Sequence, residues 1–154
     1  MLSAFAKIGA VDILMELFAN KIVITPKIYD ELSVPVEYGY AYPLNIFSKI
    51  RTITLSEDVI EEYERLKKLT LGRGELEAIA FCKKNNCIFV TNDKKAREVA
   101  KKHGVLVLSL QAVLKAIWKK KIKSKNEVKQ ILERIKDADN LSISIEVEKE
   151  IFAE

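Results

Sequence analysis

The stretch Cys87-Ile88-Phe89-Val90-Thr91-Asn92-Asp93 places a short apolar run directly before a polar triplet. Its length and its β-branched and aromatic residues predict a buried strand over residues 87–91. A helix is predicted over Glu75–Lys84 before it and another over about Lys94–Lys102 after it. In open α/β sheets ligands bind outside the carboxyl ends of the strands, so Asp93 is predicted to lie at a functional edge.

Outward from this stretch, strands and helices alternate along most of the chain. Further strands are predicted over Lys21–Ile24, Ile50–Leu55 and Val105–Leu108. Further helices are predicted over Ala4–Phe18 with a break at Gly9, from Thr25-Pro26 to an end at Pro35, from a cap at Ser56 past Leu66, and from a cap at Ser109 to about Lys119. Such alternation predicts an α/β fold with a parallel sheet covered by helices.

The carboxyl-terminal part is predicted to be helical. Ser124 and Glu127 form a capping-box pattern ahead of an apolar stripe. The stripe consists of Val128, Ile131, Leu132 and Ile135. It is expected to pack as core, by roughly three to one over a groove for a partner. With a last short helix near Glu146–Phe152, we expect one domain over residues 1–154, with about 120–154 as a helical extension.

Composition restricts the class of protein. The chain has 154 residues, 49% of them hydrophobic and 31% charged, which favours one compact domain and excludes disorder. The formal net charge is only +4, and the basic cluster Trp118–Lys123 is expected to be a solvated helix end more often than a nucleic-acid contact. No stretch is apolar enough to span a bilayer and no signal peptide is evident, which predicts a cytoplasmic protein. The bias toward Lys, Glu and Ile is typical of a thermophile.

Acidic residues lie near the ends of the predicted elements, and each has an ordinary structural interpretation. Asp93 can cap the following helix, a role worth about 1 kcal/mol. Glu31 falls on the second turn of its helix, where a glutamate is usually solvated. Glu75 is less ordinary, because its neighbours at helical spacing are apolar and a carboxylate there favours a bound cation. Glu77 is ranked behind Glu75, since a solvated or capping role is commoner.

Taken together, three carboxylates without a usable His or Cys favour a hard divalent cation. Magnesium and manganese prefer oxygen ligands. Such ions activate water and neutralise charge on a scissile phosphate, which is the chemistry of phosphoryl transfer. The residues therefore suggest metal-assisted hydrolysis.

Four segments in order give the chain a resemblance to a known family. They are Leu2–Gly9, Thr25–Leu32, Gly72–Ala80 and Val90–Arg97. With them the chain resembles PIN domains, which are metal-dependent ribonucleases that include many toxins of toxin–antitoxin pairs, and in particular a small prokaryotic branch of that family. The resemblance covers nearly the whole chain and implies a PIN-like three-layer α/β fold.

The resemblance also implies a site, a cofactor and partners. Carried over by position, the catalytic and metal-binding acids are Glu31, Glu75 and Asp93, with Thr91 lining the strand end in support. Asn92 stands where many relatives carry a second acid. The implied cofactor is Mg²⁺ or Mn²⁺, the implied substrate is RNA, and an antitoxin protein is a further implied partner.

The amino-terminal end departs from the family pattern. Similar proteins begin with an apolar strand that ends in Asp-x-Ser just before the segment matched by Leu2-Ser3. One hypothesis is that the natural protein carries about eight more residues, enough for a strand of typical length and the acid. The other is a true truncation, which would leave a gap in the sheet and a weakened metal site. We favour the first hypothesis.

The sequence thus predicts a divalent-metal-dependent endoribonuclease. A more specific form of this prediction is that the protein is the toxin of a toxin–antitoxin pair. The alternative is a catalytically impaired module that keeps the fold and binds RNA or a protein partner. Tyr38, Tyr40 and Tyr42 fit either, because alternate aromatic residues can stack on bases or form an edge or homodimer contact.

Overall fold

The computed structural model describes all residues, 1–154, as ten helices and four short strands. The helices are α1 (Leu2–Lys7), α2 (Val11–Leu17), α3 (Pro26–Glu37), α4 (Tyr42–Phe47), α5 (Glu57–Leu66), α6 (Arg73–Asn85), α7 (Lys94–Lys102), α8 (Leu110–Lys119), α9 (Lys125–Asp139) and α10 (Ile145–Phe152). The strands are β1 (Val23–Ile24), β2 (Arg51–Thr52), β3 (Phe89–Val90) and β4 (Val107–Leu108). None of the helices has the length and apolar character that a bilayer crossing requires.

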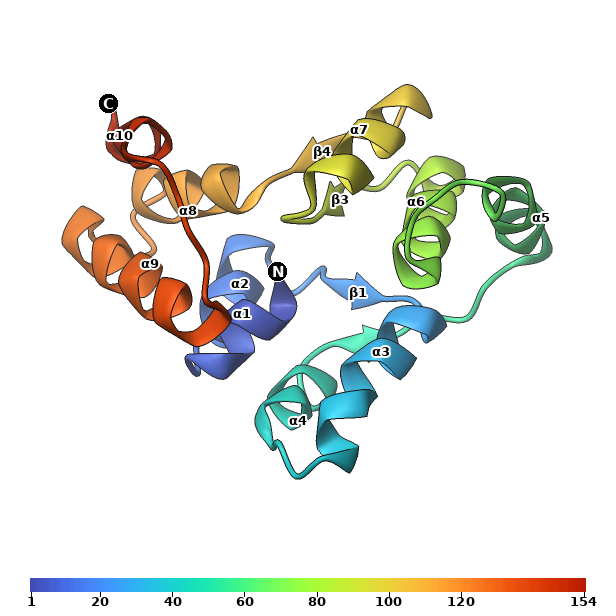
Figure 1. Cartoon of the computed structure of the whole chain (residues 1–154), viewed down its shortest axis with the longest axis horizontal. Helices are drawn as coiled ribbons and strands as arrows, with labels where there is room; N and C mark the ends of the chain where they lie inside the picture. The colour runs from blue at the N-terminus through green and yellow to red at the C-terminus, as the bar shows by residue number, and fades with distance from the viewer.

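The strands pair in parallel, as the alternation predicts, and helices flank them (Figure 1). β1 pairs with β2 and β3 pairs with β4, with Val23 opposite Arg51 and Phe89 opposite Val107. The α/β fold with parallel strands is therefore confirmed. The expectation of one continuous sheet is not met, because the strands form two separate sheets of two strands each.

Most helix boundaries follow from local chemistry. Gly9 has a φ of +69° between α1 and α2, a conformation that glycine adopts without strain, and this is the predicted break. The capping box at Ser124 and Glu127 is present, with both reciprocal hydrogen bonds. Ser109 likewise accepts a hydrogen bond from the Ala112 N–H at the start of α8.

The predicted end of α3 at Pro35 is wrong, because the helix continues to Glu37. Proline removes only its own N–H from the ladder, and in the last turn the helix loses little by this. The Pro35 carbonyl then accepts hydrogen bonds from the N–H groups of Tyr38 and Tyr40, which close the helix. The short helix α4, which carries Tyr42 and Pro43 at its start, is a further element without a counterpart among the predicted ones.

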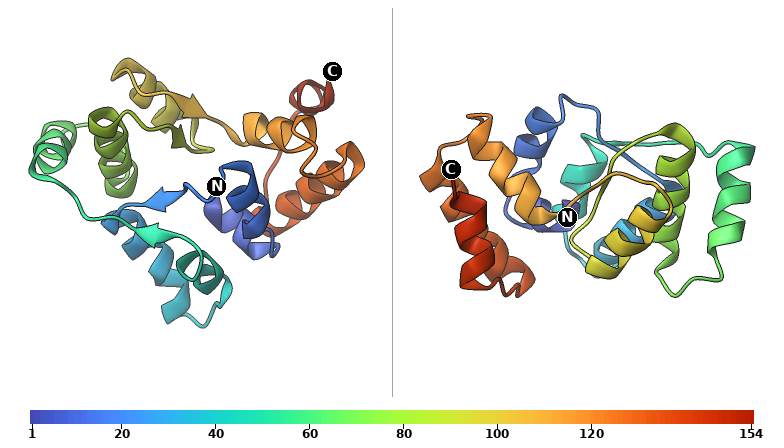
Figure 2. Two further views of the ribbon diagram at one scale, coloured as in Figure 1. Left: turned by 180° about the vertical axis from the view of Figure 1, so that it is seen from behind. Right: turned by 90° about the horizontal axis from the view of Figure 1, so that it is seen from above.

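The hydrophobic core is divided into three clusters. The largest joins α1 and α2 to α8, α9 and α10, which lie on one side of the molecule (Figures 1 and 2). The apolar stripe of α9 is buried in this cluster, which confirms its prediction as core; its members are Val128, Ile131, Leu132 and Ile135. A second cluster joins α5, α6 and α7 to β3, and a third joins α1, α2 and β1 to α4. The sheet of β1 and β2 and the sheet of β3 and β4 are thus packed against different helices.

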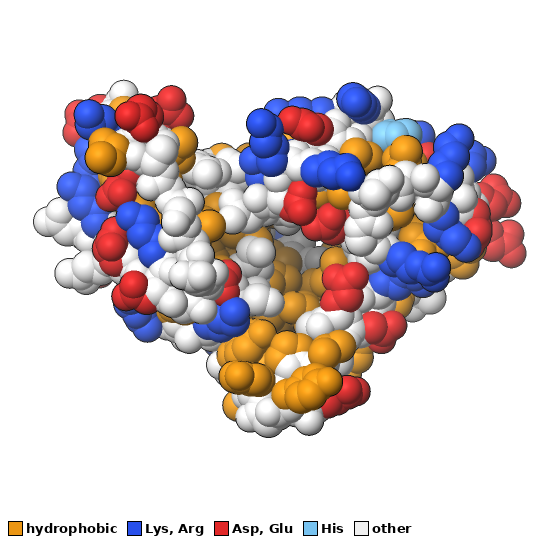
Figure 3. Space-filling view, in the orientation of Figure 1, with side chains coloured by type: hydrophobic (Ala, Val, Ile, Leu, Met, Phe, Trp, Pro, Cys, Tyr) orange, Lys and Arg blue, Asp and Glu red, His pale blue; other side chains and the backbone are white.

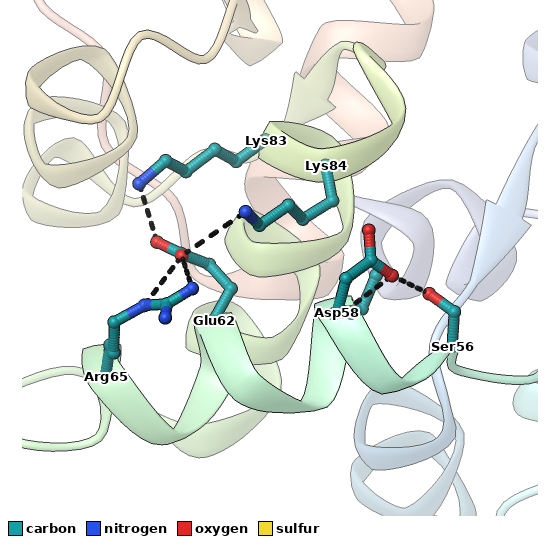
Figure 4. Close-up of polar contacts among 7 residues, drawn as sticks. Ser56, Asp58, Glu62, Arg65, Lys83 and Lys84 are labelled. Carbon is teal, nitrogen blue, oxygen red and sulfur yellow. Dashed lines mark hydrogen bonds and ion pairs between the residues drawn. The ribbon is translucent and has the colours of Figure 1, made fainter.

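An ion cluster around the buried residue Glu62 joins α5 to α6. Glu62 is 3% exposed, and its carboxylate pairs with Lys83 at 2.6 Å, Arg65 at 2.9 Å and Lys84 at 3.9 Å (Figure 4). The hydrogen bond from Lys83 lowers the pKa of Glu62 below its ordinary value of 4.5, although burial acts in the opposite direction. The ionised carboxylate is therefore stabilised by folding.

This cluster predicts an acid-sensitive contribution to stability. Because the folded-state pKa of Glu62 is lowered, its contribution is complete above about pH 4.5 and is lost as the pH falls through the folded-state value. We expect Glu62→Gln to lower the free energy of unfolding at pH 7, and the difference from the wild type to shrink at about pH 3. Urea titrations at the two pH values measure both, and a difference that does not change with pH would contradict the assignment.

Candidate active site

Glu75 is the central residue of the candidate site. It lies in the first turn of α6 and is only partly exposed. The helix dipole favours a carboxylate at this position. On the buried side of the same helix, Leu76 and Ile79 pack in the core, which fixes the orientation of the helix. Glu75 is thereby held at a defined position instead of on a free loop.

Glu31 reaches the same helix end from α3. Its Oε1 accepts a hydrogen bond of 3.1 Å from the backbone N–H of Gly74, next to Glu75. The contact crosses 43 residues of sequence and uses one of the unpaired N–H groups at the start of α6. Glu31 therefore does not have the purely solvated role that a glutamate on an exposed helix usually has.

Gly74 makes this approach possible. A Cβ atom at position 74 would lie 2.6 Å from Glu31 Oε1 and 2.8 Å from its Cδ, closer than real Cβ contacts. Any other residue there would push the Glu31 carboxylate aside. The role of Gly74 was missed at the sequence level, although the Gly72-Arg73-Gly74 pattern just before an acid was the available signal.

Asp93 lies at the carboxyl end of β3 as predicted. It caps α7, since its Oδ1 accepts a hydrogen bond of 2.9 Å from the Ala96 N–H. Its own N–H donates to Thr91 Oγ1 at 3.2 Å, and Thr91 is 9% exposed. The structural interpretation of Asp93 as an N-cap is correct, and Thr91 supports its backbone.

The charges of these acids interact. The pKa of Glu75 is raised above its ordinary value of 4.5, first by burial and then by the negative charges of Asp93 and Glu31. The amino group of Met1 acts in the opposite direction on the same carboxyl. Glu31, Glu75 and Asp93 come from three elements far apart in sequence. The fold brings them close enough for the charges of Glu31 and Asp93 to act on the Glu75 carboxyl.

The carboxylate oxygens of Glu31, Glu75 and Asp93 are ligands of the kind that a hard divalent cation prefers, but the three side chains are too far apart to hold one. All three side chains offer carboxylate oxygens, and concentrated negative charge of this kind is relieved by a bound cation. No group of three His, Cys, Asp or Glu side chains is close enough to hold a metal ion as the chain stands. A bound metal would therefore require these side chains to draw together.

Asn92 directly precedes Asp93 and borders a different part of the surface from the contact of Glu31 with Gly74. It is exposed and lines a shallow pocket with Arg97, Gln111 and the segment 141–144. Arg97 in turn donates to the Thr91 carbonyl at 3.2 Å. Thr91 and Asn92 thus have different surroundings, and Asn92 borders the carboxyl-terminal part of the chain.

Glu77 has a structural role, as its lower rank anticipated, but it is buried instead of solvated. It is 1% exposed, and its Oε1 accepts a hydrogen bond of 2.8 Å from the Lys27 N–H at the start of α3. Its Oε2 lies 3.4 Å from the Lys27 ammonium. Thr25 stands at the N-cap position of α3 but its side chain accepts no capping hydrogen bond, so Glu77 supplies the acceptor from another helix.

Removing Glu77 should therefore destabilise the fold. We expect Glu77→Ala to lower the free energy of unfolding by about 1–3 kcal/mol, because the Lys27 N–H loses its acceptor. Glu77→Gln keeps an acceptor oxygen and should cost less. Chemical denaturation distinguishes the variants, and equal losses for both would show that the charge, not the hydrogen bond, carries the effect.

The α/β fold with its parallel strands agrees with a comparison against known protein families. A family model described as a PIN domain matches residues 1–154. No curated protein and no solved structure matches the chain. The resemblance predicted from four segments is thus confirmed over the full length. The chain belongs to the PIN-domain family.

Proposed function

We propose that this protein is a divalent-metal-dependent endoribonuclease that hydrolyses RNA phosphodiester bonds at Glu31, Glu75 and Asp93. Membership of the PIN-domain family supports a nuclease-type function and the use of divalent ions. The observation that carries the proposal is the contact of the Glu31 carboxylate with the Gly74 N–H, directly before Glu75; burial and then the charges of Asp93 and Glu31 also raise the pKa of Glu75. A carboxyl whose pKa is perturbed by burial and by neighbouring charges is a candidate for a functional site.

Each residue has a role that its surroundings support. Glu75 and Asp93 would be the principal metal ligands, and Glu31 would complete the set from α3. Thr91 holds the backbone of Asp93, and Gly74 leaves room for Glu31. When bound, Mg²⁺ or Mn²⁺ would supply an activated water and neutralise charge on the scissile phosphate.

The second candidate is a module that binds RNA or a protein partner without cleaving it. The spacing of the acids favours this candidate, since no three of them stand ready to hold a metal ion. The exposed aromatic residues Tyr38 and Tyr40, 77% and 61% exposed, could serve RNA stacking, an antitoxin or a homodimer contact. An antitoxin partner, a toxin role and a cytoplasmic location are parts of the proposal that rest on the resemblance and on composition.

The proposal is tested by cleavage of a labelled single-stranded RNA in Mn²⁺ or Mg²⁺, with EDTA as the metal-free control. Glu75→Gln should abolish cleavage, while Glu98→Gln, which makes the same change on the exposed face of α7, should leave it intact. Cleavage that persists in Glu75→Gln would contradict the assignment of the site. RNA binding without cleavage in the wild type would favour the second candidate.

Metal affinity should depend on pH in a defined direction. Carboxylates bind a metal ion in their ionised form, so protonation of Glu75 competes with binding. Because the pKa of Glu75 is raised above 4.5, we expect Mn²⁺ affinity to weaken on acidification at a higher pH than ordinary glutamates would allow. Calorimetric titrations from pH 8 down to pH 5 measure this, and an affinity that stays constant down to pH 5 would contradict it.

A further inference from the structure

A pocket of about 250 Å³ lies beside Asp93, where four segments far apart in sequence meet. Asn92 comes from the end of β3, Arg97 from α7 and Gln111 from the first turn of α8. The link between α9 and α10, residues 141–144, forms most of the remaining wall. Because consecutive Cα atoms lie only about 3.8 Å apart, a ligand that contacts Asn92 also lies next to Asp93.

The lining of this pocket is mostly polar, and no carboxylate is part of it. The side-chain amides of Asn92 and Gln111 each offer hydrogen-bond donors and an acceptor, and the hydroxyls of Ser142 and Ser144 add to them. Amide side chains pair with the edge of a nucleobase, which also presents donors and acceptors side by side. The volume is below the roughly 300–1,000 Å³ of most small-molecule sites, so the pocket suits a single base better than a larger ligand.

Arg97 supplies the charge of the pocket and is fixed against the end of β3. One of its N–H groups donates to the Thr91 carbonyl at 3.2 Å. A guanidinium group has five N–H donors, so others remain for a ligand. No carboxylate of the chain forms an ion pair with Arg97. Its positive charge is therefore available to an anion.

The positive charge continues from Arg97 along α7. Lys94 and Lys101 stand three residues before and four residues after Arg97, which is the spacing of neighbours on one side of a helix. Both lysines are exposed and form no ion pair, while Ala96 and Ala100 bury another side of α7 in the core. Figure 3 shows Lys and Arg side chains gathered over α7, above a recess of the surface with acidic side chains near its rim. Such a row of unpaired cations is complementary to the phosphates of a nucleic acid.

We propose that this pocket binds one base of a single-stranded RNA and that Lys94, Arg97 and Lys101 hold the phosphates next to it. The inference rests on the proposed nuclease function and adds a site that selects the nucleotide beside the cleaved bond. Asn92 and Gln111 are the selecting residues, because their amides distinguish bases by the order of donors and acceptors on the base edge. Single-stranded RNA is the form in which a base is free to enter such a pocket.

The test measures binding of labelled homopolymeric RNAs of A, C and U by fluorescence anisotropy in EDTA, so that no metal-dependent cleavage occurs. The affinities of the wild type for the best and the poorest RNA should differ by at least about fivefold, the lower end of what a base contact contributes. Gln111→Ala should remove most of this difference and remain folded, since alanine is favoured in a helix. Gln130→Ala, the same change at an exposed position of α9, should leave the difference unchanged.

The phosphate contacts are tested by the salt dependence of the same binding. Lys101→Ala should weaken binding of all three RNAs alike, because a phosphate contact does not distinguish bases. It should also reduce the slope of log affinity against log salt concentration by about 0.7, the value for one phosphate contact with a single strand. Lys68→Ala, at an exposed position outside α7, should leave the slope unchanged.

Three outcomes would overturn the proposal. Equal affinity for the three RNAs, or a base preference that Gln111→Ala retains, would show that the pocket does not select a base. Competition by AMP, CMP or UMP as strong as that of the RNA would assign the pocket to a free nucleotide. A salt slope that Lys101→Ala leaves unchanged would remove α7 from the phosphate contacts.

The pocket and the proposed nuclease function can fail separately, because binding is measured without metal and without cleavage. A base preference that depends on Gln111, in a protein that cleaves no RNA in Mn²⁺, would support the pocket and contradict the nuclease function. Cleavage in Mn²⁺ without any base preference in EDTA would contradict the pocket alone.

Discussion

Asp93→Asn is expected to reduce manganese-dependent RNA cleavage by at least about 100-fold while leaving the fold intact, since even groups that only support a metal ligand cost up to about that much. Asn is as good an N-cap as Asp, and its Oδ1 can still accept the hydrogen bond from the Ala96 N–H. The substitution therefore removes the charge and keeps the helix start. Cleavage assays combined with thermal unfolding measure both effects.

The matched control for this variant is Asp137→Asn, an equivalent change at an exposed position of α9. It should cleave RNA like the wild type. Unchanged cleavage in Asp93→Asn would remove Asp93 from the site and leave it as a helix cap only. Loss of both cleavage and thermal stability would instead show that the capping role needs the charge.

Gly74→Ala is expected to impair the site without weakening the fold. The added Cβ would lie within 2.8 Å of the Glu31 carboxylate, which is the end of a flexible side chain and can swing away. Alanine in a helix is favoured over glycine by about 1 kcal/mol, which offsets the lost hydrogen bond from the Gly74 N–H. We expect Mn²⁺ affinity or cleavage to fall by about 10–100-fold, as when a supporting group of a metal site is lost.

Gly72→Ala provides the control, because a Cβ at position 72 would meet nothing within 4 Å. It should leave both metal binding and cleavage near the wild-type level. If Gly74→Ala behaves like Gly72→Ala, the contact between Glu31 and Gly74 has no functional role, and Glu31 should be excluded from the site.

The sequence was most informative where the chemistry is local. The helix break at Gly9, the capping box at Ser124 and the cap at Ser109 each depend on a few neighbouring residues, and all three are present. The apolar stripe of α9 is likewise buried, because its spacing places four residues on one face. The order of strands and helices was predictable for the same reason.

Contacts between distant elements were not predictable from the pattern alone. Glu77 caps α3 across 50 residues, and Glu31 meets Gly74 across 43. Neither pair has a local signature, since a glutamate in a helix has the same pattern whether it is solvated or buried. The division of the sheet also depends on which strand edges meet in space. Glu75 and Asp93 were singled out because they lie at element ends, where parallel strands and helix starts bring side chains together, whereas Glu31 was carried over from the resemblance.

A calorimetric titration of the wild-type protein and Glu75→Gln with Mn²⁺ at pH 8 tests the central claim most directly. The account predicts saturable binding to the wild type that is lost in Glu75→Gln. It also predicts that Glu75→Gln unfolds at an equal or higher temperature, because folding disfavours the ionised form of Glu75. Equal Mn²⁺ binding by both proteins, or no binding by either, would contradict the assignment of Glu31, Glu75 and Asp93 as a metal site.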